Sequence, residues 1–201
     1  INLVTPTHFV PQTAAALRMA KRNGLRIPVV YNTGSYEKPE TLKLMEGLVD
    51  IYLPDLKYGS AEPGKRYSNA PDYFETAASA IAEMVRQVPE AVFEEGEEGM
   101  ALMKRGVIVR HLVLPGGSMD SRRVLRFLHE TYGNRIYISI MNQYTPMRGL
   151  EGYPELNRRV GRRAYDRLID FAIGLGIENG FIQEGGTAKE SFVPLWDGTG
   201  L

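Results

Sequence analysis

The chain has 201 residues, the length of one α/β domain or of two small ones. Its 24 Lys and Arg residues balance its 24 Asp and Glu residues. A formal net charge of zero argues against bulk binding to nucleic acid or to a membrane surface, because such binding needs a basic excess. No apolar run approaches the roughly 20 residues that span a bilayer. The chain contains no cysteine, which excludes disulfides, a cysteine nucleophile and any iron–sulfur or zinc site held by its own thiolates.

Short apolar runs alternate with helical patterns along the sequence. The runs that predict strands are Ile1 to Val4, Ile27 to Tyr31, Val49 to Leu53, Val107 to Leu114, Ile136 to Met141 and, more briefly, Phe181-Ile182. The patterns that predict helices are about Thr13 to Arg22, Pro39 to Glu46, Asp72 to Val88, Ser121 to Tyr132 and Pro154 to Leu175. The stretch after Gly59 reads as irregular, and Glu94 to Gly99 reads as an acidic surface loop.

This alternation of strands and helices predicts right-handed βαβ crossovers and a parallel sheet, hence the α/β class. A dinucleotide-binding doubly wound sheet would carry G-x-G-x-x-G after its first strand, whereas here that strand runs into Thr5-Pro6-Thr7-His8. We therefore favour a barrel-like arrangement over an open doubly wound sheet, although five or six strands are too few for the usual eight. Residues 1–201 are expected to form one domain.

Polar residues follow most of the predicted strands at the point where each strand ends. They are Thr5, Thr7 and His8, then Asn32 and Thr33, then Asp55 and Lys57, and finally Asn142 and Gln143. Ligands of parallel α/β proteins bind at this edge of the sheet, on the strand-to-helix loops. The sequence therefore predicts a ligand-binding mouth formed by these residues.

Asp55 and Lys57 are two residues apart, so in an extended segment both side chains leave from one face. This pair is suited to holding a ribose hydroxyl and a carboxylate of a polar ligand, and the alternative is a structural ion pair at the rim. His8 is either a ligand contact or a side chain satisfied within the fold. His111 lies in the middle of a strand, where lining the core and contacting the ligand are both open.

Two further features have a functional and a structural interpretation. Gly116-Gly117 precedes a predicted helix and is either an anion-binding turn or simply a tight turn. The last predicted helix is rich in arginine, with Arg158, Arg159, Arg162, Arg163 and Arg167. This face is either solvated or a docking surface for an acidic partner.

Five phrases occur together in one order, and together they resemble the radical S-adenosylmethionine (SAM) superfamily. Within it, the chain resembles the uncharacterised iron–sulfur proteins related to pyruvate formate-lyase activating enzyme. The phrases are INLVTPTHFVPQ (1–12), IPVVYNTGSYE (27–37), VDIYLPDLKY (49–58), VIVRHLVLPGG (107–117) and MNQYTP (141–146). The resemblance covers the chain from Ile1 to about Gly180.

The resemblance implies a partial (β/α)6 barrel, of the TIM-barrel type, that holds SAM across the strand ends. In that superfamily a [4Fe–4S] cluster reductively cleaves SAM to a 5′-deoxyadenosyl radical, and activating enzymes use it to take a hydrogen atom from a glycine of a partner enzyme. The expected partners are thus SAM and a glycyl-radical enzyme or another protein substrate, with no nucleic acid and no membrane. Such a cluster needs a reducing compartment, so the expected location is the cytoplasm.

The resemblance also implies roles for individual residues. Asp55-Leu56-Lys57 matches the D-L-K strand end whose Asp and Lys contact SAM, and Asn32-Thr33-Gly34 loosely matches a T-N-G turn. Thr5-Pro6-Thr7-His8 stands in place of a Gly-Gly-Glu motif, and Gln143 lies near a histidine that covers the adenine. The expected SAM-binding residues are Thr5, Thr7, His8, Asn32, Thr33, Asp55, Lys57, His111 and Gln143.

The cluster ligands are the main departure from the family pattern. The C-x3-C-x2-C loop belongs before Ile1, and the chain opens on Ile1 inside an apolar run rather than on Met. We therefore expect a fragment that holds no metal itself, whose cluster cysteines lie upstream of Ile1. Two alternatives remain open. One is a non-catalytic SAM- or nucleotide-binding module or scaffold, and the other is a barrel lyase that forms a Schiff base on Lys57.

Overall fold

The computed structural model of the chain describes residues 1–96, 101–147 and 149–182. Within them, six parallel strands follow one another across the sheet in chain order: β1 (Asn2–Val4), β2 (Val30–Thr33), β3 (Ile51–Pro54), β5 (Ala101–Leu112), β6 (Tyr137–Met141) and β7 (Gly180–Ile182). A further strand, β4 (Val92–Glu95), pairs with β5 in the antiparallel sense. The parallel strands all end at one edge, so the loops that follow β1, β2, β3, β5 and β6 gather there.

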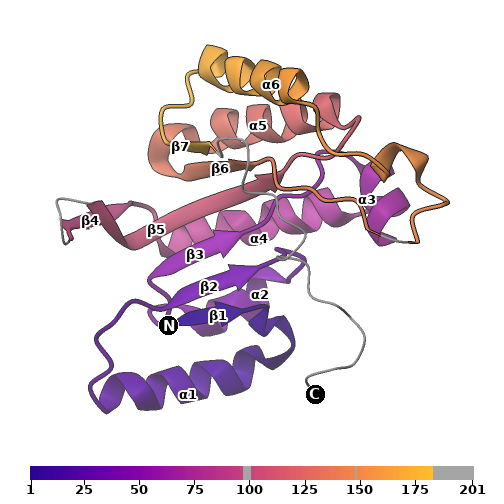
Figure 1. Cartoon of the computed structure of the whole chain (residues 1–201). Coiled ribbons are helices and arrows are strands. Elements are labelled where there is room, and N and C mark those ends of the chain that lie inside the picture. The colour runs from indigo at the N-terminus through magenta and orange to yellow at the C-terminus, as the bar shows by residue number, and fades with distance from the viewer. Residues whose placement is uncertain (97–100, 148, 183–201) are drawn as a thin grey trace.

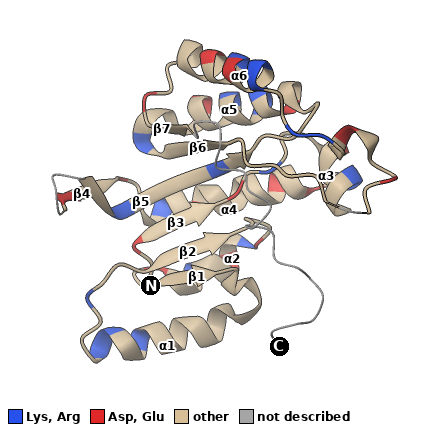
Figure 2. Cartoon of the chain, in the orientation of Figure 1, with Lys and Arg blue, Asp and Glu red and all other residues tan. Residues whose placement is uncertain are grey.

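The helices of the described residues are α1 (Val10–Arg22), α2 (Pro39–Leu42), α3 (Ala61–Ser68), α4 (Tyr73–Gln87), α5 (Ser118–Tyr132) and α6 (Arg162–Leu175). Figure 1 shows α1, α2, α4, α5 and α6 along the sheet in chain order, with α3 beyond the ends of the strands. Single 3-10 turns cover Pro6–Phe9, Lys43–Met45, Gly133–Arg135 and Pro154–Leu156. Charges of both signs are interspersed over these elements (Figure 2). No described helix is long and apolar enough to cross a membrane.

The two faces of the sheet differ in burial. On β5, Val109 and His111 are buried, whereas Arg110 and Leu112 between and after them are half-buried. Strand β6 shows the same alternation, with Ile138 and Ile140 on the buried face. Since side chains alternate with a period of two, one face packs on the helices and forms the core, and the other is only partly covered.

The predicted α/β class and mostly parallel sheet are confirmed. The sheet is open among the described residues, because β1 and β7 lie at its two edges and do not pair. The expectation of a single domain over residues 1–201 stays a prediction, since 183–201 lie outside the described residues.

Residues after Gly59 were expected to be irregular, but they form helix α3. Its periodicity is hidden by Pro63, which a first helical turn tolerates, and by Gly64. A Cβ at Gly64 would lie 2.5 Å from the carbonyl oxygen of Ala70, so glycine lets α3 approach the start of α4. The helix ends at Asn69, which takes up the left-handed conformation.

Other element boundaries in the structure also differ from the predicted ones. Glu94 and Glu95 belong to β4 rather than to a loop, because they pair with β5 and their side chains stay exposed; residues 97–99 of that predicted loop lie outside the described residues. The last helix begins only at Arg162, so Arg158 and Arg159 precede it. Helix α5 begins at Ser118 rather than at the predicted Ser121, so Ser121 lies inside the helix.

Candidate functional site

The ends of the parallel strands bring several predicted site residues together. The amide of Thr5, after β1, donates to the carbonyl oxygen of Asn32 on β2 at 2.8 Å. The amide of Asp55, after β3, donates to the carbonyl oxygen of Thr33 at 2.9 Å. Asp55 also forms a bridge with Arg110 of β5. The ends of β1, β2, β3 and β5 therefore lie side by side at one edge of the sheet.

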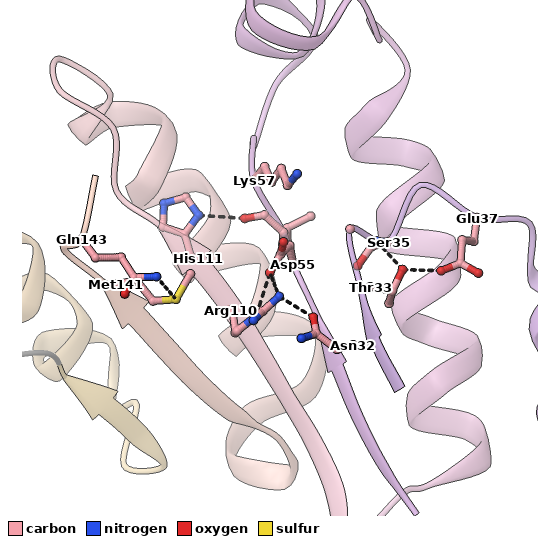
Figure 3. A network of polar contacts seen from close by, with 12 residues as sticks. Asn32, Thr33, Ser35, Glu37, Asp55, Lys57, Arg110, His111, Met141 and Gln143 are labelled. Carbon is pink, nitrogen blue, oxygen red and sulfur yellow. Dashed lines mark hydrogen bonds and ion pairs between the residues drawn. The ribbon is translucent and has the colours of Figure 1, made fainter. Parts of the chain in front are cut away.

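Arg110 joins the ends of β2 and β3 through its guanidinium (Figure 3). Its Nε donates to Oδ1 of Asp55 at 2.8 Å, and its Nη2 donates to Oδ1 of Asn32 at 2.7 Å. Nη2 also lies 2.7 Å from the Asp55 oxygen, and the two side chains are 24% and 20% exposed. No hydrogen bond from a described residue reaches Oδ2 of Asp55. The half-buried carboxylate thus has one oxygen that no described residue occupies.

The environment of Asp55 acts on its acidity in two directions. Burial raises the pKa of the carboxyl group, and the positive charges of Arg110 and Lys57 oppose that rise. A partly desolvated carboxylate forms stronger hydrogen bonds than one in water, because less solvent competes for its oxygens. Asp55 is therefore a suitable acceptor for hydroxyl or amine donors.

Lys57 is exposed and lies beside the turn that follows β2. Its Nζ is 3.8 Å from the position that a Cβ on Gly34 would occupy. Among the described residues Lys57 makes no ion pair, and Asp55 pairs with Arg110. The structural ion pair of Asp55 is thus made with Arg110 rather than with Lys57, and no described carboxylate lies within ion-pair distance of the Lys57 ammonium.

A cavity of about 380 Å³ opens beside this network. Its charged and polar lining comes from Asp55, Lys57, Arg110 and Gln143, and its apolar lining includes Leu112 and Met141. An adjoining cavity of about 390 Å³ shares Lys57 and Leu112 with it. Both volumes fall in the range of small-molecule sites, and the mixture of an apolar wall with a few polar groups is typical of them.

The turn after β2 is held by a buried carboxylate. Glu37 accepts hydrogen bonds from the Thr33 hydroxyl and, at 2.7 Å, from the Tyr31 hydroxyl. Thr33 and Glu37 are 1% and 5% exposed. The Thr33 side chain is thus used inside the fold, while its neighbour Asn32 contacts Arg110.

His111 lies on the opposite face of β5 from Arg110. Its Nδ1 is 2.8 Å from the carbonyl oxygen of Leu56 and its Nε2 is 2.9 Å from Oγ of Ser121. Because a carbonyl only accepts, Nδ1 carries the proton and Nε2 accepts from the serine hydroxyl. Burial lowers the pKa of His111, which favours the neutral ring. Both ring nitrogens are occupied within the fold.

The remaining predicted residues lie at the same edge of the sheet. Thr5 and His8 are exposed and Thr7 is half-buried, on the segment that follows β1. None of the three lines either cavity. Gln143 follows β6 and does line the first cavity, with its Nε2 directed to Sδ of Met141 at 3.8 Å.

This geometry can be compared with known proteins. No protein-family model matches the chain. The fold is similar to that of a solved enzyme domain. That structure is a domain of pyruvate-formate lyase-activating enzyme from Bacteroides vulgatus, with a TM-score of 0.64, 12% identity, and coverage of 92% of this chain and 98% of that one. At this identity the likeness concerns the fold alone.

A curated relative matches by sequence. It is an uncharacterized protein of Methanocaldococcus jannaschii, 27% identical over 164 residues, or 81% of this chain. The match spans 43% of the length of that relative.

Sequence reasoning missed Arg110 and Tyr73 at this rim. Arg110 has a local signal, since a charged residue interrupts an apolar strand one position before His111. Tyr73 has none, because it opens helix α4 far along the chain from the turns that it touches. Its hydroxyl contacts the backbone on either side of Leu56.

Proposed function

We propose that this chain supplies the SAM-binding part of a radical SAM enzyme of the activating-enzyme type. The observation that carries the proposal is the half-buried Asp55–Arg110–Asn32 network at the cavity where the parallel strands end, with the Lys57 ammonium beside it, which no described carboxylate pairs. The similarity to an activating-enzyme domain supports the same proposal.

The residues that line the cavity fit SAM chemically. SAM carries a carboxylate, an amine, ribose hydroxyls, a sulfonium and an apolar adenine face. Lys57 would pair with the carboxylate, and Oδ2 of Asp55 would accept from the ribose hydroxyls. The side chains of Leu112 and Met141 offer an apolar surface for the adenine. Thr5, Thr7, His8, Asn32 and Gln143 are proposed to complete this set from the same edge.

The residues of this chain do not fit an iron–sulfur cluster. The sequence has no cysteine, and the described residues contain no group of three or more His, Asp or Glu side chains that could hold a metal. The proposed [4Fe–4S] cluster would thus take its ligands from outside these residues, and we derive no step through it.

The proposed activity belongs to the whole protein. Bound SAM would supply, on reductive cleavage, a 5′-deoxyadenosyl radical that removes a hydrogen atom from a glycyl-radical enzyme or another protein substrate. The proposal includes a partial (β/α)6 barrel as the complete architecture and a cytoplasmic location, where a cluster is kept reduced. This chain's part is to bind and orient SAM.

Calorimetric titration of SAM into the full-length, iron-reconstituted protein tests the proposal. Asp55→Ala and Lys57→Ala are each expected to weaken binding at least tenfold, or about 1.4 kcal/mol, because each removes a charged contact. Lys43→Ala and Asp170→Ala change the same residue types at exposed helical positions and should leave the affinity unchanged. Unchanged affinity in both rim variants would contradict the assigned roles.

The absence of cysteine favours one second candidate, a nucleotide- or SAM-binding module that works without iron. The same titration on iron-free protein distinguishes the two. Full affinity without iron, and no 5′-deoxyadenosine from the reconstituted protein under anaerobic reduction, would support the module over the enzyme.

A further inference from the structure

Tyr73, the first residue of α4, reaches beneath the rim of the candidate site. Its hydroxyl lies 3.0 Å from the carbonyl oxygen of Gly34, 3.0 Å from that of Asp55, and 3.1 Å from the backbone nitrogen of Lys57. The side chain is buried, with 4% of the residue exposed. One phenol thus connects the turn after β2 with the segment after β3.

The chemistry of a phenol explains how it serves all three groups. Its single hydrogen is shared between the two carbonyl oxygens, and its oxygen accepts from the Lys57 amide. Burial raises the pKa of Tyr73, so the hydroxyl keeps its proton under ordinary conditions. The neutral hydroxyl can therefore donate to the carbonyl oxygens and accept from the Lys57 amide at the same time.

The ring of Tyr73 is fixed independently of its hydroxyl. It stacks on Tyr36, with centroids 6.1 Å apart, and meets the edge of Tyr58 at 5.3 Å. Because these contacts involve only the rings, removing the oxygen leaves the aromatic packing in place. The hydroxyl can be tested by itself.

The groups that Tyr73 holds are those that set the position of Lys57. The Lys57 ammonium lies over Gly34, whose carbonyl oxygen accepts from Tyr73, and the Lys57 amide donates to the same phenol. A change in the separation between these two segments would move the ammonium relative to the Asp55 carboxylate. The rest of the turn is anchored separately, through Thr33 and Glu37.

We propose that Tyr73 is the positioning residue of this rim: its hydroxyl fixes the Gly34 turn against the Lys57 backbone and thereby places the Lys57 ammonium for the carboxylate of the ligand. The proposal rests on the proposed SAM-binding function. Tyr73 acts through Lys57 and makes no contact with the ligand itself.

Affinity for SAM is measured by calorimetry on the full-length wild-type, Tyr73→Phe and Tyr52→Phe proteins. Tyr52 is a matched control, since it is also buried and its hydroxyl donates to Oε1 of Gln87 at 2.6 Å. This hydrogen bond lies away from the rim. Tyr73→Phe is expected to weaken binding at least fivefold, and Tyr52→Phe less than twofold at a similar loss of stability. In a Lys57→Ala background, Tyr73→Phe should cost less than twofold, because its effect passes through Lys57.

Hydrogen exchange of the Lys57 amide provides a readout that needs no ligand. Tyr73→Phe removes the acceptor of this amide, so its exchange should speed at least tenfold, while Tyr52→Phe leaves it unchanged. Unchanged exchange in Tyr73→Phe would overturn the proposal, as would equal SAM affinity in the two variants. Wild-type protein that binds no SAM would overturn the proposed function instead, and the exchange of the Lys57 amide would still decide whether Tyr73 fixes the rim.

Discussion

Two polar networks of the molecule use similar groups in different surroundings. On the helix side of the sheet, Tyr52 donates to Gln87, and the Gln87 amide donates to Glu83 at 2.8 Å and to the carbonyl oxygen of Leu42 at 3.0 Å. Glu83 and Gln87 are 6% and 9% exposed. At the rim, Arg110 contacts Asp55 and Asn32 beside an open cavity.

The difference shows that location, more than composition, decides what such a network does. Inside the fold, each partner satisfies a group that would be costly to bury alone, so the network contributes to stability. At the rim, no described residue pairs with Oδ2 of Asp55 or with the Lys57 ammonium, and the proposed role of this network is to bind a ligand. Substitutions in the two networks should therefore be read out by different measurements.

Glu83→Ala tests the network on the helix side of the sheet. It removes an acceptor that Gln87 and Arg86 both use, and we expect the free energy of unfolding to fall by about 2 kcal/mol, with SAM affinity unchanged. Urea denaturation measures this loss. Glu75→Ala, at an exposed position of the same helix, should change stability by less than about 0.5 kcal/mol. A loss of SAM affinity in Glu83→Ala would mean that the two networks are not separate.

His111 and Asp55 make the free energy of unfolding depend on pH. Burial lowers the pKa of His111, so the unfolded chain binds its proton more readily than the folded one. This group's contribution to stability is complete above the unfolded pKa of about 6.5 and is lost as pH falls below it, by at most about 1.4 kcal/mol per pH unit.

Chemical denaturation at pH 7.5 and pH 5.5 should thus show a smaller pH dependence in His111→Gln than in the wild type. Asp55 has a raised pKa and acts in the opposite direction, and the nearby Asp120 carboxylate also opposes the shift at His111. An identical pH dependence in the two proteins would show that His111 does not titrate on unfolding in this range.

Ser35 gives the smallest expected effect. It is fully buried with φ of 65°, and its Oγ has no hydrogen-bond partner among the described residues. Ser35→Gly relieves both costs against a loss of backbone entropy, so we expect a gain of about 1 kcal/mol in thermal or urea unfolding. Asn69→Gly is the control, because asparagine already tolerates its φ of 51° and little should be gained. Equal gains in stability at both positions would show that Ser35 is no more costly to the fold than Asn69.

Much of this arrangement could be predicted from the sequence. Asp55, Asn32 and Lys57 were placed correctly at one edge because parallel strands all end on the same side, and because short apolar runs mark where they end. The period of two likewise leaves His111 open between core and mouth. In the structure both of its ring nitrogens are bonded within the fold and the residue also lines the adjoining cavity, so its contact with a ligand stays a prediction.

The rest depends on contacts between distant parts of the chain. Arg110 contacts Asp55, which is 55 residues away in the sequence, and Tyr73 contacts Gly34, which is 39 residues away. Local patterns carry no information on such pairs. Helix α3 was missed for a local reason, since Pro63 and Gly64 both argue against a helix when their position in its first turn is unknown.

The alternation along β5 has a consequence for how this segment tolerates genetic change. Ile108 to Leu112 pair in register with Tyr137 to Met141, so Arg110 faces the cavity and His111 faces the helices. Suppose that a single residue between Gly106 and Arg110 is deleted while the strand keeps its pairing with β6. The two faces would then be exchanged, so that the Arg110 guanidinium would point toward the apolar core and the His111 imidazole toward the mouth. Point substitutions in this strand act one side chain at a time, whereas a one-residue deletion inverts the whole segment at once.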